Sequence, residues 1–211
     1  MAQNVDALKN SVKLARVIPV MILDDVDVAK PLAEALVAGG LNVLEVTLRT
    51  PNALKVMAEM AKVKGAIVGS GTVRNALHMQ QSVDAGCQFM VSPGAPIKLL
   101  EAAENVDIPL LPGVGSPTEA MAASEMGYSF LKFFPAEAMG GANVLKAFAS
   151  PFSDLVFCPT GGVSPDNAAG YLNLSNVICV GGSWVTPQDL IARNDYGAIE
   201  KLATQARQLG D

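Results

Sequence analysis

Eight short apolar segments recur along this chain of 211 residues, and their starting points lie 20 to 26 residues apart. Most are rich in valine, isoleucine, leucine or phenylalanine without polar alternation, which is typical of parallel strands covered on both faces. The intervening segments predict helices, as in the stripe of Leu54, Met57, Ala58 and Ala61, which follows the spacing of one helix face. The eight predicted strands are Val17–Leu23, Leu41–Leu48, Ala66–Val68, Gln88–Val91, Ile108–Leu111, Ser129–Phe134, Leu155–Cys158 and Val177–Val180.

Four helix starts are marked by a hydroxyl residue followed by proline, which is favoured at the first helical position. Eight alternations of strand and helix predict a (β/α)8 TIM barrel over residues 17–211, preceded by an extra helix over residues 1–16, in a single domain of residues 1–211. An open doubly wound sheet is the alternative, but no GxGxxG motif follows the first strand. The four starts are Thr50-Pro51, Ser116-Pro117 (with Glu119 completing a capping box), Ser164-Pro165 and Thr186-Pro187.

The composition excludes several classes of function. The net charge is −5 and no run of lysine or arginine occurs, so nucleic-acid binding is not expected. No apolar stretch is long enough to span a membrane, and the N-terminus lacks the apolar core of a signal peptide, so we expect a cytoplasmic protein. Only 17% of the residues are charged, which leaves room for an apolar interface and favours a homo-oligomer.

Ligands for a metal are scarce in the sequence. The three cysteines are widely spaced and fit neither a disulfide framework nor a zinc site, and His78 is the single histidine. The carboxylates of Asp24, Asp25 and Asp27 could hold a cation, but a helix start follows them, and N-capping is the better interpretation. We therefore expect no metal and no cofactor.

One lysine stands out because it lies in a predicted strand with apolar neighbours on both sides. Lys132 sits in the segment Phe130-Leu131-Lys132-Phe133-Phe134-Pro135. Burial of an unpaired ammonium costs several kcal/mol, so such a site favours the neutral amine, a nucleophile that forms Schiff bases with ketones. A structural lysine that reaches solvent or pairs with a buried carboxylate is the alternative.

Two further charged residues are expected beside Lys132, because the active sites of such barrels lie at the C-terminal ends of the strands. Glu45 is embedded in the second predicted strand, and a carboxyl group in apolar surroundings can serve as general acid or base. A plain buried ion pair with Lys132 is the alternative, although a resting pair can also release its amine when substrate enters. Arg49, at the end of that strand, can bind a carboxylate or phosphate, or be a surface residue.

Glycine pairs follow the last two predicted strands. Gly161-Gly162 precedes the helix start at Ser164, and Gly181-Gly182-Ser183 precedes the one at Thr186. Exposed backbone N–H groups near helix starts bind phosphate, and phosphate-binding barrels commonly use these two loops. The sequence therefore predicts a phosphate site, although glycine also serves tight turns.

Five motifs fall in order at five strand ends, and together they resemble the 2-keto-3-deoxy-6-phosphogluconate (KDPG) aldolases, which also act as 4-hydroxy-2-oxoglutarate aldolases. The similarity covers the chain from about residue 17 to residue 184, and Ser70 stands where the family often has alanine. The motifs are Leu44-Glu45-Val46-Thr47-Leu48-Arg49-Thr50, Gly69-Ser70-Gly71-Thr72, Ser92-Pro93-Gly94, Lys132-Phe133-Phe134-Pro135-Ala136-Glu137 and Pro159-Thr160-Gly161-Gly162.

The resemblance implies a metal-free class I aldolase that catalyses the last step of the Entner–Doudoroff pathway, usually as a homotrimer. Its partners would be a small keto acid and its phosphate ester, with no nucleic acid and no membrane. By the same resemblance Lys132 is the Schiff-base lysine and Glu45 the proton-transferring carboxylate. The implied substrate-binding residues are Arg49, Thr72 and Pro93 for the pyruvate part, Thr160 for the middle hydroxyls, and Gly161, Gly162, Gly182 and Ser183 for the phosphate.

Three alternatives to this function stay open. An isomerase or epimerase barrel acting on phosphosugars would share the phosphate loops but would not need the lysine in a strand. A relative in the same family would cleave the galactonate epimer, although the hydroxyl of Thr160 favours the gluconate form. A non-catalytic sensor of phosphate ligands would not need both Glu45 and Lys132.

Overall fold

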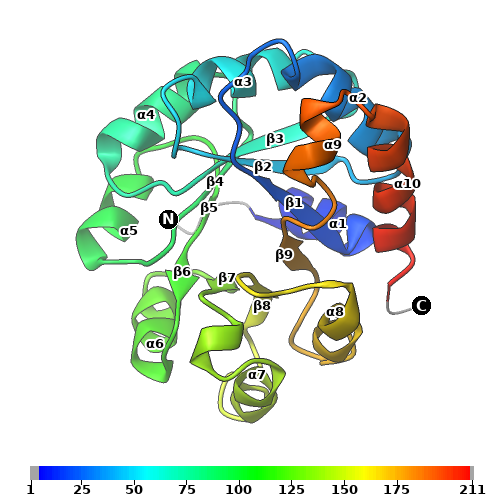
Figure 1. Cartoon of the computed structure of the whole chain (residues 1–211). Helices are drawn as coiled ribbons and strands as arrows, with labels where there is room; N and C mark the ends of the chain where they lie inside the picture. The colour runs from blue at the N-terminus through cyan, green and yellow to red at the C-terminus, as the bar shows by residue number, and fades with distance from the viewer. Residues whose placement is uncertain (1–4, 210–211) are drawn as a thin grey trace.

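The computed structural model describes residues 5–209, in which helices alternate with parallel strands (Figure 1). The strands are β1 Val17–Met21, β2 Val43–Thr47, β3 Ile67–Gly71, β4 Phe89–Val91, β5 Leu110–Leu111, β6 Gly113–Val114, β7 Phe130–Phe133, β8 Val156–Pro159 and β9 Val180–Gly182. The helices are α1 Asp6–Ala15, α2 Ala29–Ala38, α3 Ala53–Met60, α4 Ala76–Asp84, α5 Ile97–Ala103, α6 Pro117–Glu125, η1 Glu137–Met139, α7 Ala142–Phe148, α8 Pro165–Leu172, α9 Gln188–Ala192 and α10 Tyr196–Arg207.

The parallel sheet curls inside an arc of helices and consists of two pieces. Six strands follow the order β5-β4-β3-β2-β1-β9, and three follow the order β6-β7-β8. Pro112 separates β5 from β6, and its carbonyl accepts a hydrogen bond of 2.9 Å from the backbone N–H of Lys132. Isolated parallel bridges from Phe157 to Val177 and from Thr160 to Gly181 link β8 to the segment of β9. The predicted parallel α/β fold with a TIM-like curl is confirmed.

The strand boundaries differ from the prediction mainly near glycine and proline. The third predicted strand, β3, extends to Gly71. The eighth predicted strand, β9, begins only at Val180 and ends in a glycine pair. The fifth predicted strand is interrupted at Pro112, because proline lacks the N–H that would continue the ladder, and it resumes beyond Pro112 as β6.

The first helix fills the inner core beside the strands. Leu8 and Val12 of α1 pack in one buried cluster with Ile18, Val43 and Phe89 of three strands, and α1 lies next to β1 inside the arc of outer helices. The helix thus occupies the segment for which the sequence predicts one. Residues 1–4 and 210–211, at the two ends of the predicted domain, lie outside the described residues. Within the described part of the chain, no helix has the length and apolarity that a membrane span requires.

Two of the four predicted helix starts are confirmed. Helices α6 and α8 begin at their prolines after serine N-caps, but Glu119 accepts from the N–H of Gly115 rather than from that of its own N-cap, at 2.6 Å. The other two predictions are wrong by one or two residues, since α3 begins at Ala53 and α9 at Gln188. There the threonine hydroxyls donate to the carbonyl oxygens of Leu23 and Ser183 instead.

Candidate active site

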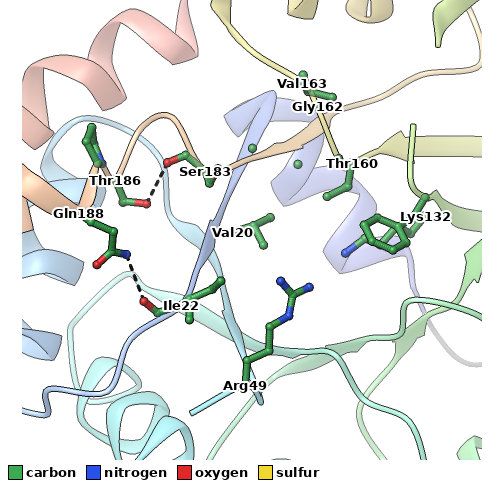
Figure 2. Close-up of a pocket in the computed structure, with 15 residues that line it drawn as sticks. Val20, Ile22, Arg49, Lys132, Thr160, Gly162, Val163, Ser183, Thr186 and Gln188 are labelled. Atoms are coloured by element: carbon green, nitrogen blue, oxygen red, sulfur yellow. Dashed lines mark hydrogen bonds between the residues drawn. The ribbon is translucent and has the colours of Figure 1, made fainter. Parts of the chain in front are cut away.

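A cavity of about 420 Å³ opens at the C-terminal ends of the strands, where β1, β7, β8 and β9 end (Figure 2). Lys132 and Arg49 are the cationic side chains in its wall, and Figure 2 shows both directed toward the same space. The wall is formed by Val20, Ile22, Arg49, Lys132, Phe134, Thr160, Gly161, Gly162, Val163, Gly181, Gly182, Ser183, Thr186, Pro187 and Gln188.

Lys132 and Glu45 form a buried ion pair beside this cavity. Lys132 Nζ lies 3.3 Å from Glu45 Oε1, and the two side chains are only 5% and 4% exposed. Glu45 points inward from β2, a strand that is buried along its whole length. Lys132 Nζ also lies 5.3 Å from the centre of the Phe134 ring, which favours a cation at that position.

A glycine makes room for the Glu45 carboxylate. A Cβ atom on Gly71 of the neighbouring strand β3 would overlap Glu45 Oε1 and would lie 2.9 Å from its Cδ and Cγ. Among the described residues Glu45 is not part of the cavity wall, whereas Lys132 is. The amine therefore faces the cavity, and the carboxylate lies behind the amine, close enough to exchange a proton with it.

The side chain of Arg49 is held by a hydrogen bond to Thr72. The Arg49 guanidinium donates through Nε to Thr72 Oγ1 at 2.9 Å. Its terminal nitrogens have no partner among residues 5–209 and can make a bidentate contact with a carboxylate. Thr72 has a positive φ of 62° and lies outside the cavity wall of the described residues. A threonine held in this unfavourable conformation is typical of a functional site.

Pro93 likewise lies outside the cavity wall. A Cβ on Gly113 would meet the backbone of Pro93, and Gly113 is the register partner of Lys132. The backbone of Pro93 thus packs against β6, and β6 lies between Pro93 and the strand of Lys132.

The predicted phosphate loops meet on the cavity wall. Gly161 and Gly162 have φ values of 100° and 79°, which only glycine adopts without strain. Thr160 is buried, and a Cβ on Gly181 would overlap its hydroxyl, so glycine is needed there for close packing. In Figure 2, Ser183 lies across the cavity from Lys132, with Thr160 nearer the amine.

Several wall residues were not found from the sequence. Val20 and Ile22 could have been found, because both lie in the predicted strand Val17–Leu23, where residues two apart share a face. Thr186 also lines the cavity, although the sequence assigns it only to a helix start. Gln188 carries no sequence signal, and its amide Nε2 donates to the carbonyl oxygen of Ile22 at 3.2 Å across the rim.

A buried lysine paired with a carboxyl group, with an arginine and glycine-rich turns around one cavity, fits the class of lysine-dependent aldolases, which are carbon–carbon lyases. The family model "KDPG and KHG aldolase" matches residues 8–202, and the chain belongs to this family.

Relatives of the chain are named as KDPG aldolases. The "KHG/KDPG aldolase" of Escherichia coli (strain K12) is 49% identical over 90% of each chain. A KDPG aldolase of Legionella pneumophila, solved with pyruvate as a covalent carbinolamine intermediate, has a TM-score of 0.91 and 43% identity, over 94% of this chain and 97% of that one. The KDPG aldolase of Zymomonas mobilis ZM4, solved with 3-phosphoglycerate, has a TM-score of 0.90 and 46% identity, over 97% and 96%.

Proposed function

We propose that this aldolase cleaves KDPG to pyruvate and glyceraldehyde 3-phosphate, and that it also cleaves 4-hydroxy-2-oxoglutarate. The observation that carries the proposal is the amine of Lys132, which faces the cavity 3.3 Å from the carboxylate of Glu45. The covalent carbinolamine of the Legionella relative supports an attack by a lysine on a keto acid. The 3-phosphoglycerate of the Zymomonas relative supports a phosphate ester as ligand.

The first half of the reaction makes the covalent bond. Lys132 gives a proton to Glu45 and attacks the C2 ketone as a neutral amine. Glu45, directly or through one water, returns the proton to the carbinolamine hydroxyl, which leaves as water. The resulting iminium draws electrons from the neighbouring carbons and so serves as the electron sink.

The second half breaks the carbon–carbon bond. Glu45 removes the proton of the C4 hydroxyl, the electrons of the C3–C4 bond flow to the iminium, and the aldehyde leaves an enamine behind. Glu45 then protonates C3, and hydrolysis frees pyruvate from Lys132. One carboxyl group suffices because each step returns the proton that the next step needs.

The remaining residues hold the substrate. Arg49, fixed by Thr72, takes the carboxylate of the pyruvate part, with the Pro93 backbone beside it. Thr160 meets the middle hydroxyls. The N–H groups of Gly161, Gly162, Gly182 and Ser183 take the phosphate, whose binding orients the reacting carbon.

We also propose that the sheet forms a closed eight-stranded barrel in one domain of residues 1–211. Two features support the closed barrel: β5 and β6 count as one strand around Pro112, and two parallel bridges join β8 to the segment of β9.

A homotrimer and a cytoplasmic location complete the proposal. Three exposed apolar side chains, Leu77, Ile97 and Met121, lie on the successive helices α4, α5 and α6 and support an interface between copies. The cytoplasmic location agrees with the three free thiols of the chain. Light scattering of the purified protein tests the trimer, and a monomeric mass would contradict it.

The test of function compares three substrates with the full chain in the presence of EDTA. We expect pyruvate from KDPG and from 4-hydroxy-2-oxoglutarate, with lower kcat/KM for the galactonate epimer of KDPG. A preference for that epimer would identify the chain as the related aldolase that cleaves the galactonate form. Thr160 would then be the first residue to substitute in order to alter the preference between the two epimers. Isomerised sugar phosphate without pyruvate would contradict the proposal, and so would loss of activity in EDTA.

A further inference from the structure

A tyrosine and a glutamate join two elements on the far side of the glycine turn at residues 161–162. Tyr171 of α8 is 1% exposed, and its hydroxyl donates to the carboxylate of Glu137 in η1. Burial and the facing carboxylate raise the pKa of Tyr171, so the phenol stays protonated and remains the donor. Among the described residues, neither side chain belongs to the cavity wall.

The segment around Glu137 contacts the turn directly. The backbone N–H of Glu137 donates to the carbonyl oxygen of Gly161 at 3.0 Å, and that of Ala136 donates to Thr160 at 2.8 Å. A Cβ on Gly162 would lie 2.6 Å from Glu137 Cγ, so the stem of this side chain packs against the glycine.

The other side of the turn is held by the first residues of α8. The Asn167 amide donates through Nδ2 to the carbonyl oxygen of Gly162 at 3.0 Å, and its Oδ1 accepts from the N–H of Ser164 at 2.8 Å. The turn thus lies between η1 and α8, and the contact from Tyr171 to Glu137 ties these two elements together.

We propose that the Tyr171–Glu137 contact is a positioning device that holds the Gly161–Gly162 turn in the shape that binds the substrate phosphate. Two adjacent glycines lose more backbone entropy on ordering than other residues do, so the turn needs support from outside. The contact acts through the turn and not on the reacting carbons. The inference rests on the proposed function, since it takes the phosphate to bind at this turn.

The test uses a substrate with a phosphate and one without. We expect Tyr171→Phe to raise KM for KDPG about tenfold, which corresponds to about 1.4 kcal/mol, and to leave kcat and KM for 4-hydroxy-2-oxoglutarate unchanged. Glu137→Ala should reproduce this selective loss, whereas Glu137→Gln keeps an oxygen that accepts from the phenol and should restore KM. The matched control is Tyr196→Phe on α10, whose hydroxyl donates to Asn194 Oδ1 at 2.9 Å, away from the cavity.

The variants also separate a positioning role from a structural one. The Tyr171→Phe/Glu137→Ala double variant should have the same KM for KDPG as either single variant, because all three variants lose the same contact. An equal rise of KM for both substrates, or no rise for KDPG, would overturn the inference. Glu137 is exposed, so Glu137→Ala gives the answer even where Tyr171→Phe fails to fold.

The proposed function fails separately, if the wild-type chain cleaves neither substrate. Calorimetry with glycerol 3-phosphate then compares wild type with Tyr171→Phe. Weaker binding by the variant supports the positioning role, and equal binding overturns it.

Discussion

Replacement of Gly71 by alanine should disable the enzyme without unfolding it. The added Cβ would overlap the Glu45 carboxylate and would lie 2.9 Å from its Cδ and Cγ. Carbon atoms prefer separations of about 3.5 to 4.0 Å, so the carboxylate must retreat by about 1 Å. The atoms that must move belong to one flexible side chain and not to the backbone, so we expect the melting temperature to stay near that of wild type.

The rate should respond far more than the stability. A displacement of about 1 Å at a catalytic group can cost about 100-fold in rate, which corresponds to about 2.7 kcal/mol of activation free energy. The assay follows pyruvate release from KDPG through lactate dehydrogenase and NADH. We expect kcat to fall about 100-fold by this geometric argument.

Gly197→Ala is the matched control for this substitution. Gly197 lies within α10, and a Cβ added there would meet nothing within 4 Å. We expect wild-type kcat and, because alanine favours helix, a gain in stability of about 0.5–1 kcal/mol. A folded Gly71→Ala variant with wild-type kcat would refute the reasoning, since the carboxylate would then not be needed at its present position.

Three further predictions concern the ion pair and the residues proposed to bind the carboxylate and the phosphate of the substrate. Glu45→Gln should lower kcat by about 10²- to 10⁴-fold while pyruvate still inhibits competitively; normal turnover would make Glu45 merely structural. Glu45→Leu should lower the free energy of unfolding in urea by about 3–5 kcal/mol by leaving Lys132 unpaired, and adding Lys132→Met should recover most of this loss. A double variant no more stable than Glu45→Leu would contradict that account. Arg49→Ala should raise KM for both substrates. Gly162→Ala should raise KM only for the phosphorylated substrate, because a side chain at a φ of 79° strains the turn whose N–H groups take the phosphate; identical selectivity of the two variants would argue against these assignments.

Features that depend on a few neighbouring residues could be predicted from the sequence. The starts of α6 and α8 are fixed by a serine and the proline after it, which act within one turn. The pairing of Lys132 with Glu45 was predictable because both are charged residues in strands that lead to the same edge of the sheet. The family was predictable because its motifs recur in order.

Features that depend on distant contacts could not be predicted. The hydroxyl of Thr50 donates to the carbonyl oxygen of Leu23 in another loop, so α3 begins later than the local pattern indicates. The place of Gln188 on the rim follows from a contact with Ile22, 166 residues away in the chain. Pro112 divides one strand in two, and the sequence does not indicate that the sheet continues beyond it.

Reductive trapping gives the most direct test of the central claim, that Lys132 is the nucleophile. The folded protein is treated with pyruvate and borohydride, digested, and analysed by mass spectrometry. We predict one modified lysine, Lys132, carrying the atoms of pyruvate less one oxygen after reduction of the imine, and no such product from Lys132→Met. A label on another lysine, or equal labelling of Lys132→Met, would contradict the account.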